Sequence, residues 1–256
     1  MSARFEELDW RTTPMGAISL RRRRDPISGE DIYEVKLDDD YLMSSLFVVA
    51  EVEVARLALV ELHDMPGGGL DVAVGGLGLG YTAQTVLEHE NVGSLVVVET
   101  LGEVIEWHES GLIPVGATLT SDARCRLVQG DFFAMIDSMS GLDPENPGRR
   151  FHAIILDVDH SPRHLLHPSH AAFYEPAGVR RLADHLHPGG IFSLWSNDPP
   201  DEDYTKLLAE VFVDVTSHVV SFHNPLQGRD ATNTVYVAKT AAASVDEATA
   251  TGDLEA

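Results

Sequence analysis

The sequence is poor in cysteine and in long apolar runs, and each shortage narrows the class of protein. Its 256 residues include a single cysteine, Cys125, which cannot form an internal disulfide, so a reducing cytoplasm is the expected location. No apolar run approaches the roughly 20 residues of a membrane-spanning helix. No basic, apolar leader of the secretory kind begins the chain. We therefore expect a cytoplasmic protein that does not bind a membrane.

Basic residues are also scarce. Lysine and arginine together number 18 against 41 aspartates and glutamates, so the formal net charge is -23. Such a charge repels nucleic acid over most of the surface and attracts small cations. Part of it lies in residues 241–256, whose Ala, Thr and Glu composition predicts a disordered acidic tail. The expected partner is a small cationic molecule and not nucleic acid.

A glycine-rich turn between a strand and a helix is the most informative motif. Residues 72–74 form a short apolar run, residues 75–80 read GGLGLG, and a helix is expected over residues 81–89. Glycines allow positive φ and let a ligand approach the backbone closely, although such turns can also serve only to pack a helix on a sheet. The candidate ligand-binding glycines are Gly75, Gly76, Gly78 and Gly80.

An acidic residue follows the turn at the distance that a nucleotide site requires. A second apolar strand, residues 95–98, ends in Glu99, about twenty residues beyond the turn, where a carboxylate can accept both hydroxyls of a ribose. Thr100 lies next to it. The spacing predicts an adenosine-type ligand. Because GGLGLG lacks the third glycine of the dinucleotide fingerprint, S-adenosylmethionine fits better than a dinucleotide.

Two further acidic residues follow predicted strands. Asp131, next to Phe132, follows the strand expected at residues 125–128; it can accept from an adenine amino group, cap a helix over residues 132–139, or do both. Asp157 follows the fully apolar run 151–156, which places it at the carboxyl edge of the sheet. Open α/β folds bind ligands and carry out chemistry at that edge. We therefore interpret Asp157 as the catalytic residue, with a plain loop or cap role as the alternative.

Taken in order, five segments resemble the spermidine synthase (polyamine aminopropyltransferase) family, over residues 70–239. They read VAVGGLGLG, VVVE, QGDFF, FHAIILDVDHSP and HAAFYEPAGVRRLADHLHPGGIFSLW. The resemblance implies an α/β fold of the class I S-adenosylmethionine-dependent methyltransferase type, with a Rossmann-like sheet, helices on both faces and an antiparallel final strand. It also implies that Asp157 corresponds to the family aspartate that takes a proton from the attacking amine.

One departure from the family bears on the reaction. The family turn carries an aspartate that favours the cationic tail of decarboxylated S-adenosylmethionine, and this chain has Gly78 there. That aspartate would repel the carboxylate of ordinary S-adenosylmethionine by about 3 kcal/mol at roughly 5 Å and an effective dielectric of about 20. Without it, we expect methyl transfer from S-adenosylmethionine to a small cationic amine. The alternatives are aminopropyl transfer from the decarboxylated donor and a non-catalytic, cofactor-binding regulatory protein.

The acceptor is expected over the carboxyl ends of the fourth and fifth strands, where four candidate residues lie. Trp195 could stack on a cation or pack in the core. The family's Tyr-His-Glu acceptor motif is missing from residues 44–63. The spacing of histidines 160, 164, 167 and 170 would suit a metal site if they shared one face of a helix. Pro162 and Pro168 interrupt any such helix, so we expect no metal. The acceptor-binding candidates are Asp159, His160, Trp195 and Asn197.

The chain divides into four expected regions. Residues 1–43 form a small β unit whose hairpin spans residues 16–42, with residues 21–24 on a solvated edge. Residues 44–67 hold a connecting helix to about residue 63, capped by Ser44 or Ser45, whose apolar face could form a homodimer. Residues 68–240 form the catalytic domain, closed by antiparallel strands at 212–221 and 234–238. The tail follows.

Overall fold

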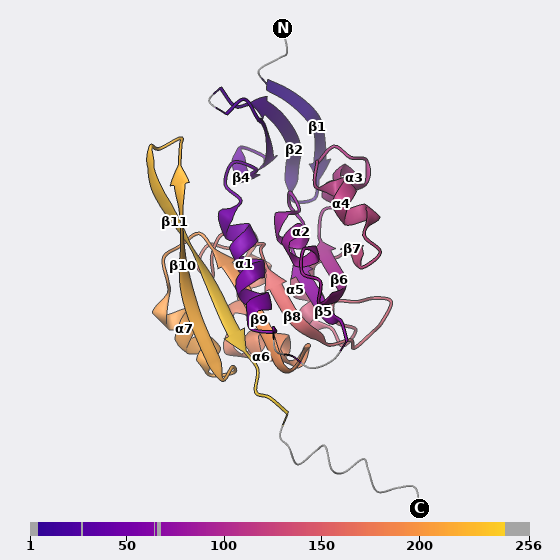
Figure 1. Ribbon diagram of the computed structural model, residues 1–256, viewed down its shortest axis with the longest axis vertical. Helices are drawn as coiled ribbons and strands as arrows, with labels where there is room; N and C mark the ends of the chain where they lie inside the picture. The colour runs from indigo at the N-terminus through magenta and orange to yellow at the C-terminus, as the bar shows by residue number, and fades with distance from the viewer. Residues whose placement is uncertain (1–4, 27, 64, 66–67, 244–256) are drawn as a thin grey trace, which may run out of the picture.

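The protein consists of a small antiparallel sheet above a larger, mainly parallel sheet (Figure 1). A computed structural model of the chain describes residues 5–26, 28–63, 65 and 68–243. None of the helices in these residues is long and apolar enough to cross a membrane. Most of the predicted acidic tail lies outside the described residues.

The large sheet forms the core of the protein. Its strands are β5 (Leu70–Gly75), β6 (Val92–Glu99), β7 (Cys125–Gln129), β8 (Phe151–Leu156), β9 (Leu186–Ser196), β10 (Asp214–Asn224) and β11 (Arg229–Lys239). They lie in the order β10-β11-β9-β8-β5-β6-β7, in which β5 to β9 are parallel and β10 and β11 are antiparallel. Central strands such as β5 and β8 are covered on both faces, which is why they are almost continuously apolar. The predicted strands and the antiparallel closing pair are confirmed, and the pair is longer than expected.

Helices cover both faces of this sheet. The helices are α1 (Val49–Val60), α2 (Tyr81–Leu87), α3 (Gly102–Glu109), α4 (Gly116–Ser121), α5 (Phe132–Asp137), the 3-10 helix η1 (Pro168–Tyr174), α6 (Pro176–Asp184) and α7 (Glu202–Ala209). Buried side chains of α1 to α4 belong to one hydrophobic cluster, and those of α5, η1, α6 and α7 belong to the other. The two clusters lie on opposite faces because neighbouring residues of a strand point to opposite sides. The predicted α/β fold class is confirmed.

The N-terminal unit is a four-stranded antiparallel sheet, in which the predicted hairpin forms the two central strands. Its strands, in spatial as in chain order, are β1 (Phe5–Thr13), β2 (Gly16–Arg24), β3 (Asp31–Leu37) and β4 (Asp40–Ser44). Strand β1 has little of the alternating apolar pattern that identifies a strand, because most of its side chains stay outside the core. On β2, Ile18 and Leu20 are fully buried and join the core cluster of the main domain.

The four arginines of β2 lie inside this sheet, which corrects the prediction of a hairpin edge. Strand β2 has a neighbour on each side, and each arginine pairs with an acidic side chain. Arg23 lies 2.7 Å from Glu34. Arg21 pairs with Glu7, Arg22 with Glu6 and Arg24 with Asp31. Residues that look like a basic patch in the sequence are thus largely neutralised across the strands.

The connecting helix is shorter than expected and is not capped by a serine. Helix α1 begins at Val49 with no side-chain cap, because Val48 is at the N-cap position. The Ser45 hydroxyl instead accepts the amide of Tyr33, and the Ser44 hydroxyl accepts that of Leu46. The buried side chains of α1 pack on its own chain, against α2 and the large sheet. That apolar face is therefore not available for the predicted homodimer.

Candidate functional site

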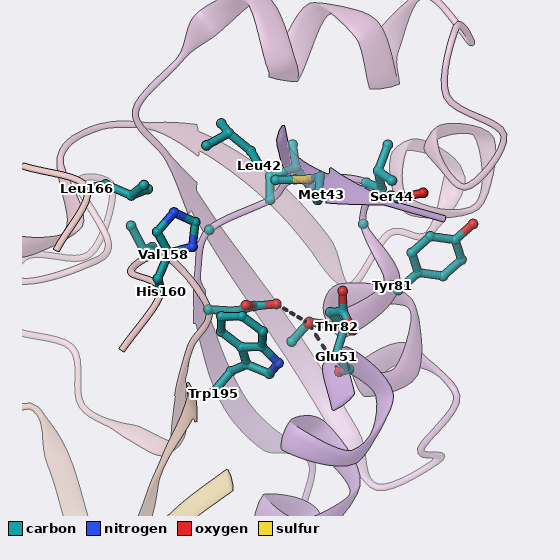
Figure 2. A pocket seen from close by; sticks show the side chains of 16 residues that line it. Leu42, Met43, Ser44, Glu51, Tyr81, Thr82, Val158, His160, Leu166 and Trp195 are labelled. Carbon is teal, nitrogen blue, oxygen red and sulfur yellow. Dashed lines mark hydrogen bonds between the residues drawn. The ribbon is translucent and has the colours of Figure 1, made fainter. Parts of the chain in front are cut away.

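Two connected cavities lie above the carboxyl ends of the parallel strands, beneath the N-terminal sheet. The larger has a volume of about 460 Å³ and the smaller about 100 Å³. Figure 2 shows the smaller cavity, which is lined from α1, β4, the glycine turn and the loop after β8. The residues at the junction of the two include Met43, Gly76, Gly78 and Asp157. Two molecules, one bound in each cavity, would therefore meet beside Asp157.

The glycine turn connects β5 to α2 and needs glycine for steric reasons. Gly76, Gly78 and Gly80 have φ values of 94°, 49° and 91°. A Cβ atom on Gly76 would lie 2.2 Å from the carbonyl oxygen of Asp157, because the loop after β8 passes directly beside the turn. Gly75 is different, since its missing side chain makes room for the Phe132 ring. Gly76, Gly78 and Gly80 therefore line the smaller cavity, whereas Gly75 provides packing space for a side chain.

Glu99 ends β6 and holds the glycine turn in place. Its carboxylate accepts the amide of Leu77 at 3.0 Å and the amide of Leu101 at 2.9 Å. Burial raises the pKa of the Glu99 carboxyl. The backbone amides of Gly78 and Thr100 also act on this carboxylate, and both Glu99 and Thr100 line the larger cavity. The structure thus shows Glu99 holding the glycine turn, and the ribose contact stays a prediction.

Asp131 caps helix α5, so the helix-cap interpretation is confirmed. One carboxylate oxygen accepts the amides of Phe133 at 2.9 Å and Ala134 at 3.2 Å. The residue also lines the larger cavity with Phe132 and Phe133. The cap does not use the second carboxylate oxygen, and the adenine contact stays a prediction.

Asp157 lies at the end of β8, beside a second carboxylate that the sequence analysis missed. The Thr82 hydroxyl lies 3.0 Å from the Asp157 carboxylate and 3.2 Å from the backbone carbonyl of Glu51 in α1 (Figure 2). Burial raises the pKa of Asp157 to about 6. Burial and then the charge of Asp157 raise the pKa of Glu51 to about 8. A glutamate between apolar residues in VVAEVEV was the only sequence signal for this contact.

Of the four predicted acceptor residues, only His160 and Trp195 line the smaller cavity. Asp159 is buried, and its carboxylate accepts the Leu166 amide at 2.7 Å and the Tyr174 hydroxyl at 3.0 Å, with His170 at 2.8 Å. It lines neither cavity and holds the loop in shape.

The exposed Asn197 side chain accepts from Asn233 at 3.1 Å. The backbone amide of Asn197 donates to the His160 carbonyl at 2.7 Å. These positions do not support acceptor contacts by Asp159 or Asn197. Trp195 is half-buried and lies against the cavity, where it both packs and offers a ring face.

Three of the histidines in this region have separate partners. His164 lies 2.9 Å from Asp198, His167 contacts Ser169, and His170 contacts Asp159. They do not converge on a common point.

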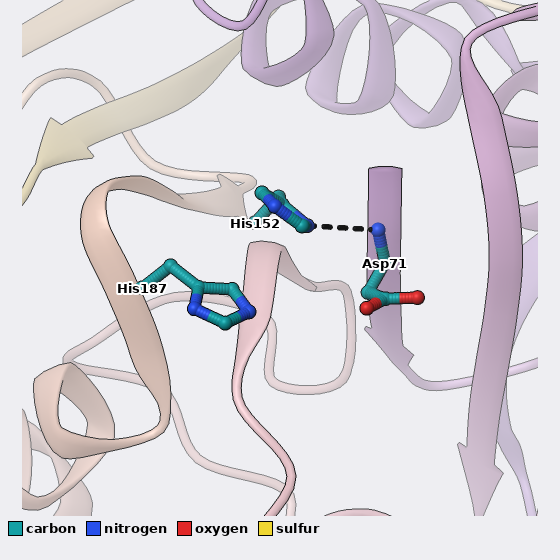
Figure 3. Close-up of side chains that lie close together, drawn as sticks. All are labelled: Asp71, His152 and His187. Carbon is teal, nitrogen blue, oxygen red and sulfur yellow. Dashed lines mark hydrogen bonds between the residues drawn. The ribbon is translucent and has the colours of Figure 1, made fainter. Parts of the chain in front are cut away.

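A tighter group, Asp71, His152 and His187, lies at the amino ends of β5, β8 and β9, away from both cavities (Figure 3). Nδ1 of His152 accepts the Asp71 amide at 2.9 Å. The Asp71 carboxylate is bound by Ser94 and Arg149. These hydrogen bonds join neighbouring strands, so the cluster has a structural explanation.

His108 supports the glycine turn from α3. It is fully buried, Nε2 lies 2.9 Å from the carbonyl oxygen of Gly78, and burial lowers the pKa of its imidazole. The neutral ring therefore donates from Nε2 to the turn. We expect His108→Leu to weaken donor binding about tenfold, because the Gly78 carbonyl loses its partner.

His108→Gln is the matched control, because its amide nitrogen can replace Nε2 and should restore binding. Calorimetric titration with the donor, alongside the acceptor KM, measures the effect. Equal donor affinities for the two variants would contradict a positioning role.

The strand order is that of the class I methyltransferase fold, and the two cavities lie at the carboxyl ends of its parallel strands. No family model matches the chain. It is 29% identical over 184 residues to polyamine aminopropyltransferase 2 of Pseudomonas aeruginosa, an alignment that covers 68% of this chain and 46% of that protein. The chain thus spans about half the length of this curated relative.

Solved spermidine synthases have the same fold. A spermidine synthase in complex with the transition-state analogue AdoDATO has a TM-score of 0.69 at 17% identity, covering 94% of this chain and 76% of that chain. The spermidine synthase of Thermotoga maritima has a TM-score of 0.68 at 18% identity, covering 94% and 75%. The predicted resemblance to spermidine synthases is confirmed in the fold.

Proposed function

We propose that this protein is a transferase that moves an aminopropyl group from decarboxylated S-adenosylmethionine to a small cationic amine. The observation that carries the proposal is the position of Asp157 at the junction of the two cavities, beside Glu51. The similarity to an aminopropyltransferase and to spermidine synthases supports this reaction over the methyl transfer expected from Gly78. The donor is a substrate, consumed in each turnover.

The larger cavity would hold the adenosine part of the donor. Glu99 would accept the ribose hydroxyls, and Asp131 and Phe132 would contact the adenine. The turn at Gly76 and Gly78 lines both cavities, so the reacting carbon would lie near the junction. The smaller cavity would hold the amine.

Asp157 would then prepare the amine for attack. An ammonium ion has no lone pair, and Asp157 would accept one of its protons as a general base. The donor supplies an activated carbon: the nitrogen bonds to that carbon while the C–S bond breaks and its electron pair stays on sulfur. Because the pKa of Asp157 is raised to about 6, the residue is a stronger base than an exposed aspartate and is still ionised at neutral pH.

Methyl transfer from S-adenosylmethionine is the second candidate, and one observation favours it. A Cβ atom on Gly78 would lie 2.7 Å from the sulfur of Met43, which packs over the turn from β4. An apolar side chain thus occupies the space beside the residue where spermidine synthases carry an aspartate. The turn itself therefore has no carboxylate that would repel the ordinary donor.

The by-product distinguishes the two reactions. We expect purified protein given decarboxylated S-adenosylmethionine and an aliphatic diamine to release methylthioadenosine, detected by liquid chromatography. Release of S-adenosylhomocysteine from the ordinary donor instead would favour methyl transfer. Binding of either donor without any product would favour the third alternative, a cofactor-binding regulatory protein.

A further inference from the structure

Two carboxylates line the smaller cavity, and no lysine or arginine is among the residues that the structure places around it. Glu51 enters it from the first turn of α1, and Asp157 from the loop after β8. The Thr82 hydroxyl connects these two segments through its contacts with the Asp157 carboxylate and the Glu51 carbonyl (Figure 2). The ion pairs found in the described residues include neither Glu51 nor Asp157. The acidic pair therefore lacks the cation that buried carboxylates normally require.

Two unpaired carboxylates in a partly buried site cannot both ionise easily. Burial, and then the charge of Asp157, raise the pKa of Glu51 to about 8, and burial raises that of Asp157 to about 6. The other titratable groups that face the cavity are Tyr81 from α2 and His160 from the loop. Burial raises the pKa of Tyr81, and the charges of Glu51 and Tyr33 act in the same direction. The Tyr81 hydroxyl therefore stays neutral. Near neutral pH the empty pair thus holds one proton and one negative charge.

The remaining walls suit an aliphatic chain. Leu42, Met43 and Leu166 line the same cavity, and Trp195 presents its indole to it. An alkylammonium ion whose ammonium group lies between the carboxylates would place its methylene groups against these apolar side chains. The matching ligand is an aliphatic amine with a primary ammonium group.

We propose that Glu51 and Asp157 bind this ammonium group together, as a two-carboxylate clamp that holds one proton when empty and releases it when the amine enters. The balance is simple: the singly protonated pair and one ammonium ion become a doubly ionised pair with its ammonium, and one proton leaves to solvent. The reaction of the bound amine rests on the proposed function, whereas its binding by the clamp does not. It makes Glu51 a binding residue for the acceptor, supplied by a helix outside the nucleotide-binding strands.

Proton release can be measured without any turnover. We would titrate the donor-free protein with 1,4-diaminobutane at pH 7 in two buffers that differ in ionisation enthalpy. The wild type is expected to release close to one proton per amine bound. Glu51→Gln should bind the amine about tenfold to a hundredfold more weakly, because a charged hydrogen bond is lost, and should release almost no proton.

Glu53→Gln is the matched control, because Glu53 lies on the same helix and pairs with Arg56 at 3.3 Å. This variant should behave like the wild type. Amine binding without proton release, release that persists in Glu51→Gln, or no amine binding by the wild type would each overturn the clamp. Proton release without aminopropyl or methyl transfer would instead overturn only the proposed function, so the two failures are distinguishable.

Thermal unfolding as a function of pH tests the same pair independently of any ligand. The folded-state pKa values lie above the ordinary carboxyl values, so the protonated pair contributes stability at low pH that falls as the pH rises above about 4 and is lost by about pH 8. Glu51→Gln should remove the upper part of this decline and unfold at a higher temperature than the wild type at pH 9. An unchanged decline in the variant would contradict a shared proton.

Discussion

Asp157→Asn is expected to lower kcat by about 10² to 10⁴-fold while the donor still binds, because general bases contribute about that much to a proton-transfer step. The amide keeps the shape of the side chain and the contact with Thr82, but it cannot accept a proton from the amine. Single-turnover measurements at saturating donor, with calorimetry for donor affinity, separate the two effects. The kcat/KM of the wild type should rise with pH through the Asp157 pKa of about 6.

Asp137→Asn is a suitable control, since Asp137 lies on the exposed side of α5 and pairs with Arg181 at 2.6 Å. It should retain wild-type turnover. Full activity of Asp157→Asn would exclude the proposed base, whereas loss of donor affinity together with kcat would indicate a mainly structural role at the junction.

Gly76→Ala is expected to have the largest effect on the fold of the site. The new Cβ atom would lie 2.2 Å from the Asp157 carbonyl oxygen, and the residue must keep a φ of 94°. We expect the free energy of unfolding to fall by about 3 kcal/mol or more, because the backbone conformation alone costs about 1 to 2 kcal/mol and the clash adds to it. Donor binding should be lost, since relief of the clash moves the turn away from β8.

Gly111→Ala separates the clash from the conformational cost. Gly111 has a φ of 75°, and nothing lies within 4 Å of the position that its Cβ would take. Its substitution should cost only about 1 to 2 kcal/mol and leave donor binding intact. Urea unfolding and calorimetric titration of both variants check the expectation, and equal losses would mean that the turn at Gly76 can shift without harm.

Most of the residues predicted for the donor side line the cavities, because each belongs to a local pattern, while their contacts with a donor stay predictions. In parallel α/β sheets the binding residues follow directly after buried strands. Gly76, Glu99, Asp131 and Asp157 could therefore be placed from apolar runs and spacing alone. The helix-cap role of Asp131 followed from its position before a helix.

The acceptor side was predicted poorly, because its residues come from distant segments. His160 and Trp195 line the cavity, but Asp159 turns inward to His170 and Tyr174. A strand and its loop determine which residues reach the sheet edge, but not which of two neighbouring aspartates faces the cavity. That choice depends on the hydrogen-bond partners that the fold supplies to each side chain.

What the sequence determined by itself is the α/β fold, the position of the glycine turn and the acidic residues at the ends of β6, β7 and β8, since these depend on hydrophobic periodicity and local spacing. Only the tertiary structure brought Glu51 beside Asp157, placed Met43 over Gly78 and set His108 beneath the turn. These contacts join segments far apart in the chain. The physical reason is that burial and mutual proximity, which shift the pKa values of Glu51 and Asp157, exist only once α1, β8 and the N-terminal sheet have packed together.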